Sequence, residues 1–200
     1  MPIDLAGLAR LSLTDPKAGA AAVLREAAGW PAPVLWQTGA LVVLLSVILS
    51  ELSAALTGGP RPPGVVGAVL ANPLAMAAVQ GVIFVIAVHA THRIGRLFGG
   101  QGGDAGALAL VVWTQVLMLG VQAVQALAFI VMPGLGAMIG MASVVLFFWV
   151  FTNFVRVLHG FRSAGAVFVG IVASGLAIMF GVSMLLAFLG LLFPGAIPRV

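Results

Sequence analysis

Apolar residues run almost without interruption from about residue 33 to residue 193, and short segments rich in glycine and proline divide them. A bilayer hydrocarbon core about 30 Å thick is crossed by about 20 helical residues. Lipid cannot satisfy exposed backbone polar groups, so each apolar stretch is expected to be helical. The pattern therefore predicts an all-α polytopic membrane protein with five transmembrane helices in a bundle. Their predicted bounds are about residues 34–56, 73–98, 105–131, 135–158 and 164–193.

The first 32 residues have a different pattern, in which charged and apolar positions alternate without a continuous apolar core. They do not resemble a signal peptide. Thr14 or Asp15 can cap a helix that Pro16 begins, so we expect a short helix over about residues 16–28. Its side with Val23, Leu24 and Ala27 is expected to lie on the membrane as an amphipathic interfacial helix. A loosely attached cytoplasmic tail is the alternative. At the other end, residues 194–200 are expected to form a short outer tail.

The composition agrees with a membrane protein, since 62% of the residues are hydrophobic and 7% are charged, against about 25% charged in soluble domains. The net charge of +4 comes mainly from arginines beside the apolar stretches, which argues against nucleic acid as a partner. Cysteine is absent, so disulfides and thiolate metal sites are excluded. No metal site and no cofactor are predicted. The bias toward arginine, alanine, glycine and proline suggests a bacterial inner membrane.

The distribution of basic residues predicts the orientation, because positive charge in short loops is retained on the cytoplasmic side. Seven basic residues fall on one predicted side: Arg10, Lys17, Arg25, Arg93, Arg96, Arg156 and Arg162. Arg61 and Arg199 fall on the other. We therefore expect a cytoplasmic amino terminus and an outer carboxyl terminus.

One group of those basic residues is a candidate binding site. The ends of the second and fourth predicted helices bring together Arg93, Arg96, Arg156, His159 and Arg162. Such a cluster can bind an anionic lipid headgroup or an acidic segment of a partner. Positive-inside placement of arginine alone is the alternative interpretation.

Polar side chains inside the apolar stretches are the second candidate set: Glu51, His89, Gln115, Gln122, Gln125 and Asn153. The three glutamines share one side of the third predicted helix, and carboxamides in lipid are costly unless hydrogen-bonded. They are interpreted either as hydrogen bonds between helices or as the lining of a polar pathway. His89 and His92 alone are too few ligands for a zinc site.

Small residues repeat at helical spacing on three of the predicted helices, and close backbone approach is a main source of helix association in lipid. The candidate packing positions are Gly39, Ser46, Gly136, Gly140, Gly170, Ser174 and Gly181. They are expected to pack within one chain or between copies of it.

The order of these features resembles the bacterial branch of the Yip1 family. The features are a Thr14-Asp15-Pro16 start, a Gly-Gly-x-Gly turn from Gly99, Phe148-Trp149 in the fourth helix, and a His-Gly-Phe-x-Ser ending from His159. The resemblance implies five spans with a cytoplasmic amino terminus. For eukaryotic relatives it implies vesicle trafficking, Rab GTPase association and membrane shaping. This chain lacks their Asp-Leu-Tyr-Gly-Pro motif and has no tyrosine.

Two functions follow as hypotheses. The first is a non-enzymatic membrane scaffold or adaptor, whose partners are membrane lipids, a second copy of the chain or another membrane protein. The second is a small transporter or channel with a polar pathway along the third helix. A dry bundle with its polar groups satisfied favours the scaffold, whereas a wet cavity joining those groups favours transport.

Overall fold

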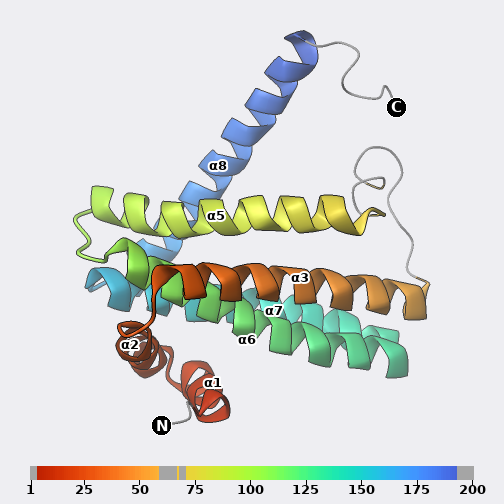
Figure 1. Ribbon diagram of the computed structural model, residues 1–200, viewed down its shortest axis with the longest axis horizontal. Helices are drawn as coiled ribbons and strands as arrows, with labels where there is room; N and C mark the ends of the chain where they lie inside the picture. The colour runs from red at the N-terminus through yellow and green to blue at the C-terminus, as the bar shows by residue number, and fades with distance from the viewer. Residues whose placement is uncertain (1–3, 59–66, 68–70, 193–200) are drawn as a thin grey trace.

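The computed structural model describes residues 4–58, Gly67 and residues 71–192, and throughout these the regular structure is helical (Figure 1). Seven helices are described: α1 (Leu5–Thr14), α2 (Pro16–Ala27), α3 (Ala32–Thr57), α5 (Pro73–Leu97), α6 (Asp104–Val131), α7 (Pro133–His159) and α8 (Ala164–Leu192). Five of them, α3 and α5 to α8, are long and apolar enough to cross a membrane. The predicted all-α fold with five spans and a preceding short helix is confirmed. Arg61 and Arg199, which entered the orientation argument, lie outside the described residues.

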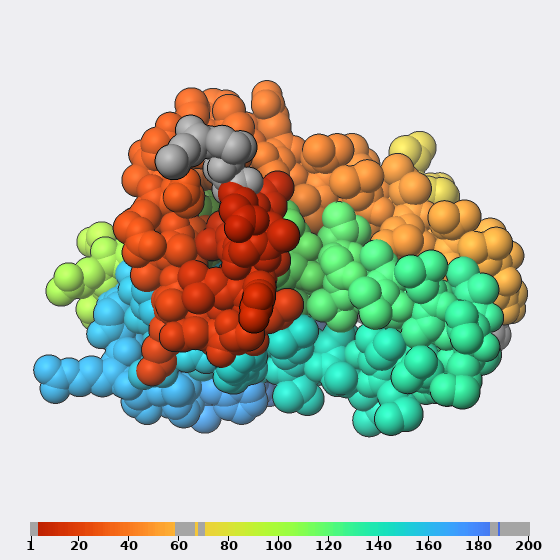
Figure 2. All heavy atoms as spheres, turned by 90° about the horizontal axis from the view of Figure 1, so that it is seen from below, coloured from red at the N-terminus to blue at the C-terminus, as the bar shows by residue number. Residues whose placement is uncertain are grey.

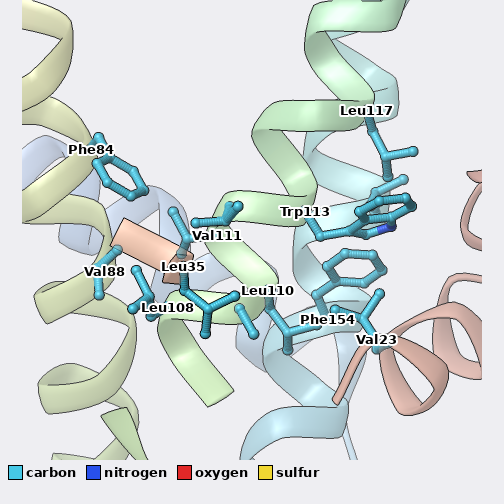
Figure 3. Close-up of a cluster of buried hydrophobic side chains, with 14 of the residues drawn as sticks. Val23, Leu35, Phe84, Val88, Leu108, Leu110, Val111, Trp113, Leu117 and Phe154 are labelled. Carbon is cyan, nitrogen blue, oxygen red and sulfur yellow. The ribbon is translucent and has the colours of Figure 1, made fainter. Parts of the chain in front are cut away.

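The centre of the bundle is α6, which packs against α3, α5 and α7. Its first half is buried without a break from Ala107 to Thr114. Leu110 and Trp113 of this segment meet Phe154 of α7, which is fully buried (Figure 3). A helix that is apolar all round and covered by protein belongs to the interior of a bundle. The spans α3, α5 and α7 therefore pack around α6, and their outward sides remain apolar and exposed.

The amino-terminal segment forms two helices, α1 and α2, of which the sequence pattern predicted only the second. The carboxylate of Asp4 caps α1 by accepting from the Gly7 N–H at 2.8 Å. Asp15 caps α2 by accepting from the Lys17 and Ala18 N–H groups, both at 3.1 Å. Satisfying the free N–H groups of a first turn in this way stabilises a helix by about 1 kcal/mol. The short α1 therefore depends on a cap as well as on packing.

The side of α2 that we expected on the membrane contacts the protein. Val23 is buried in the core (Figure 3). Leu24 and Ala27 pack against the same core. The helix lies against α6 and α7 rather than apart from the bundle. Both helices of this amino-terminal hairpin lie across the long axis of the bundle on one flank (Figures 1 and 2).

The last helix, α8, leans away from the other four spans along much of its length (Figure 1). It packs against α7 near its start, where Val167 is buried and the rings of Phe148 and Phe168 are 5.5 Å apart. Farther along, Leu176, Met179 and Phe180 are exposed. The apolar surface of α8 is suited to lipid or to another membrane helix.

Candidate functional site

One end of the bundle collects the predicted basic cluster. Since the spans alternate in direction, α5 and α7 end where α6 and α8 begin, beside the amino-terminal hairpin (Figure 1). Besides the basic residues of the hairpin, this end carries Arg93, Arg96, Arg156 and Arg162. We call it the basic end.

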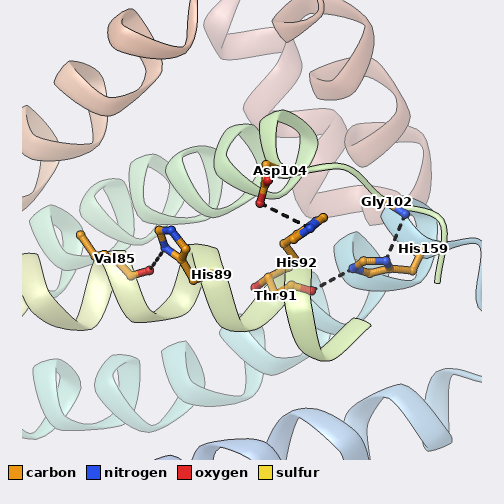
Figure 4. A network of polar contacts seen from close by, with 7 residues as sticks. All are labelled: Val85, His89, Thr91, His92, Gly102, Asp104 and His159. Carbon is orange, nitrogen blue, oxygen red and sulfur yellow. Dashed lines mark hydrogen bonds and ion pairs between the residues drawn. The ribbon is translucent and has the colours of Figure 1, made fainter. Parts of the chain in front are cut away.

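His159 holds the basic end together. Its side chain is 2% exposed, and both ring nitrogens have backbone partners (Figure 4). The Gly102 N–H donates to Nδ1 at 3.2 Å, and Nε2 lies 2.9 Å from the carbonyl oxygen of Thr91. Because Nδ1 accepts, Nε2 must carry the proton and donate, which assigns the neutral tautomer. One imidazole thus joins the end of α7, the end of α5 and the loop between α5 and α6.

Glycines make room for this ring. A Cβ atom at Gly95 or Gly100 would overlap the imidazole, and one at Gly102 would lie 2.9 Å from its Cε1. Gly99 has φ +81° and Gly160 has φ +71°, in the left-handed region that glycine adopts without strain. We call His159 with Gly95, Gly100 and Gly102 the histidine clasp. The glycine turn after the second span and the His-Gly sequence after the fourth are therefore parts of one packing arrangement.

The five residues predicted to bind lipid or a partner do not form one surface. Arg93, Arg96 and Arg162 are exposed, whereas His159 is interior and its ring nitrogens are occupied. Arg93 precedes Gly95 by two residues, which puts it about 160° around α5 from the side that faces His159. Arg93 and Arg96 are three residues apart and therefore lie on one side of α5, whereas Arg162 lies in the connection from α7 to α8.

Arg156 is half-buried and bonded within its own segment. Its Nη2 donates to the Arg162 carbonyl oxygen at 2.8 Å, and its Nη1 donates to Asn153 Oδ1 at 3.3 Å. The amide nitrogen of Asn153 in turn donates to the Trp149 carbonyl oxygen at 2.8 Å. Arg156 therefore orders the connection from α7 to α8.

The two histidines of α5 have separate environments (Figure 4). His89 Nδ1 lies 2.9 Å from the Val85 carbonyl oxygen, and its ring lies 6.2 Å from that of Trp36. His92 Nε2 lies 3.5 Å from Asp104 Oδ1 at the start of α6. Among the described residues, no three His, Cys, Asp or Glu side chains are grouped as metal ligands. His92 and Asp104 add a second polar contact across the loop between α5 and α6.

The glutamines of α6 contact different helices. Gln122 Nε2 donates to the Ser46 carbonyl oxygen of α3 at 3.0 Å. Gln125 instead lies over Gly140 of α7, where an added Cβ would be 2.6 Å from its Nε2. Gln115 is half-buried on α6, and Glu51 is half-buried on α3. These polar positions are distributed over the bundle and do not form one row facing a common neighbour.

Ser46 connects three spans. Its hydroxyl donates to Gln80 Oε1 of α5 at 2.7 Å, while its carbonyl oxygen accepts from Gln122. We did not single out Gln80 from the sequence. Gln80 could have been found as a carboxamide inside an apolar stretch, where it needs a hydrogen-bond partner such as a serine of a neighbouring span.

The predicted small-residue positions fall into two groups. Gly39 faces the ring of Phe84, Gly136 faces Phe129, and Gly140 faces Gln125, so these glycines allow close contact within the chain. In α8, an added Cβ at Gly170 or Gly181 meets no atom within 4 Å among the described residues, and Ser174 between them is half-buried.

A family model described as the Yip1 domain matches residues 10–191, which is nearly the whole chain. No curated protein and no solved structure matches the chain at a significant level. The match extends from α1 to the end of α8 and contains every part of the histidine clasp. The chain belongs to the Yip1 family.

Proposed function

We propose that this protein is a non-enzymatic membrane scaffold whose basic end binds anionic lipid headgroups. The observation that carries the proposal is the exposure of Arg93, Arg96 and Arg162 around one end of a bundle of five apolar helices. The histidine clasp joins the ends of α5 and α7, which lie next to these arginines. The basic end would face the cytoplasm of a bacterial cell.

Charge at a membrane surface supplies the affinity. Each arginine close to an anionic leaflet contributes about 1 kcal/mol, and the attraction falls off within a Debye length. Three exposed arginines together are sufficient to enrich anionic lipid around the protein. Because Arg93 and Arg96 lie on α5 and Arg162 lies in the connection from α7 to α8, they suit several headgroups at the membrane surface better than one headgroup in a pocket.

The polar groups within the bundle support a scaffold over a transport pathway. Ser46 of α3 is hydrogen-bonded both to Gln122 of α6 and to Gln80 of α5. Gln125 of α6 packs on α7. Carboxamides that bond between helices stabilise a bundle. The Yip1 family is also a membrane protein family that is not known as enzymatic.

Native mass spectrometry from mild detergent tests the proposal. The chain would be purified with phosphatidylglycerol and compared with the triple variant R93Q/R96Q/R162Q. We expect retained phosphatidylglycerol in the wild type and loss of most of it in the triple variant, with partial recovery at low salt. Arg156 is left unchanged because it is bonded to the connection between α7 and α8.

The matched control is R61Q/R199Q, which removes charge from the side predicted to be opposite. This control should retain the lipid. Equal retention by the wild type and the triple variant would contradict lipid binding at the basic end. The alternative would then be that these arginines bind an acidic protein segment, from a second copy of the chain or from another membrane protein.

A further inference from the structure

The amino-terminal hairpin, formed by α1 and α2, contacts α6 at two positions along its axis. These two contacts fix how far each helix of the hairpin lies from the start of α6. Leu24 of α2 lies against Gly106, where an added Cβ would be 3.2 Å from Leu24 Cδ2. Ser12 of α1 lies against Trp113, whose Nε1 donates to the Ser12 Oγ at 2.9 Å in a buried contact. Gly106 and Trp113 are seven residues apart, or about 10 Å along the helix axis. This is the usual distance between two packed helices. Along the axis of α6, α1 therefore lies about one helix diameter farther from the first residue of α6 than α2 does.

The length of α6 relates these positions to the bilayer. It has 28 residues, or about 42 Å of helix, which matches the full bilayer thickness of about 40–45 Å with headgroups. Its first residue, Asp104, therefore belongs at the outer edge of the headgroups. The hydrocarbon begins about 5–7 Å farther in. The Trp113 Cα is about 13 Å in, and its side chain points back toward the start of the helix. Ser12 is thus a few ångströms inside the hydrocarbon boundary.

The exposed side chains of α1 fit that depth. Leu5 is 59% exposed, Leu11 36% and Leu13 37%. The apolar residues of α2, by contrast, are used in contacts with the bundle. Arg10 is exposed on α1 and has a long stem that can reach the headgroups from this depth. Leu11 and Leu13 lie on the two flanks of α1, each about 100° around the helix from Ser12, which faces Trp113.

We infer that α1 is a lipid-contacting helix, held by Trp113 at the boundary between headgroups and acyl chains of the leaflet at the basic end. Its leucines contact the upper acyl chains, while α2 lies above it among the headgroups. The inference is independent of the proposed function, because it concerns acyl chains and needs no anionic lipid. It also differs from our expectation for the amino-terminal segment, in which α2 was to contact the membrane through Val23, Leu24 and Ala27.

Single labels test this depth, since the chain contains no cysteine. Cysteine would be introduced by Leu11→Cys, Leu13→Cys or, as the matched control on α2, Lys17→Cys, and labelled with the fluorophore NBD. All three positions are exposed, so the Ser12–Trp113 contact is retained. The full chain would be reconstituted in neutral phosphatidylcholine vesicles. One quencher is a phosphatidylcholine with a nitroxide near the top of its acyl chain, and the other is aqueous cobalt.

We expect the lipid quencher to reduce the fluorescence at positions 11 and 13 about twofold more than at position 17, as for helices buried 5–10 Å in the interface. Aqueous cobalt should give the opposite order. Equal quenching of all three labels by cobalt would overturn the inference and place the whole hairpin in water. Because the vesicles are neutral, neither outcome depends on whether the arginines bind anionic lipid.

Discussion

The imidazole of His159 lies so close to the α carbon of Gly95 that a methyl group at position 95 would overlap Nε2. These residues belong to α7 and α5, two spans separated in the sequence by α6. The contact allows the ring to reach the Thr91 carbonyl on one side and the Gly102 amide on the other.

Replacing Gly95 by alanine should therefore displace the histidine. We expect Gly95→Ala to lower the free energy of unfolding by about 1–3 kcal/mol, the usual cost of overpacking. An SDS titration followed by circular dichroism measures this loss. Gly120→Ala on α6 is the matched control, because an added Cβ there meets no atom within 4 Å. Equal stability of the two variants would mean that the ring can move aside without cost.

The histidine itself should matter through its hydrogen bonds. His159→Ala leaves the Gly102 N–H without its partner, at about 1–3 kcal/mol if that group stays buried, and removes the bond to the Thr91 carbonyl oxygen, at about 1 kcal/mol. His159→Gln should retain part of this stability, because a carboxamide both donates and accepts. The comparison of the two variants in the same SDS titration checks this. If alanine and glutamine lower stability equally, the clasp depends on the shape of the ring alone.

The bond between Trp113 and Ser12 should be measurable as a coupling. Trp113→Phe and Ser12→Ala each remove it, so a double-mutant cycle is expected to give a coupling energy of about 1 kcal/mol. Trp149→Phe is the control, since Trp149 is 43% exposed and its replacement should change little. A coupling of zero would show that the hairpin is held by apolar packing without this bond.

The contact of Gln122 with Ser46 should contribute modestly. Gln122→Leu removes a hydrogen bond between α6 and α3, and such bonds between membrane helices average about 0.6 kcal/mol. We expect a loss of that size in unfolding free energy and no change in solute flux across proteoliposomes. A flux present in the wild type and abolished in Gln122→Leu would favour the transport hypothesis.

The spans could be predicted from the sequence because each element is set by local composition. An apolar stretch long enough to cross a bilayer has no alternative to a helix. The second span was predicted to begin at Pro73, where α5 begins, whereas α7 begins at Pro133, two residues before the predicted start of the fourth span. The start of α2 followed from Asp15 and Pro16 in the same way. These predictions needed no knowledge of what lies beside each helix.

The histidine clasp could not be predicted in this way, because it depends on which helices become neighbours. The sequence placed His159 among basic residues at a helix end, and that position is compatible with a surface site. Its burial follows from three glycines on another span and its loop, whose missing side chains leave the space that the ring fills. The helix α1 was missed for a related reason, since ten residues rarely form a stable helix without tertiary contacts.

The docking of the amino-terminal hairpin on α6 and α7 has a consequence for synthesis. Its binding surface includes Trp113 and Phe154, which leave the ribosome about 100 and 140 residues after Ser12. Domains otherwise tend to fold in the order in which they are made. The amino-terminal hairpin can complete these contacts only after α6 and α7, the third and fourth of the five spans, have been inserted. The amino terminus of the chain is thus among the last parts to assemble.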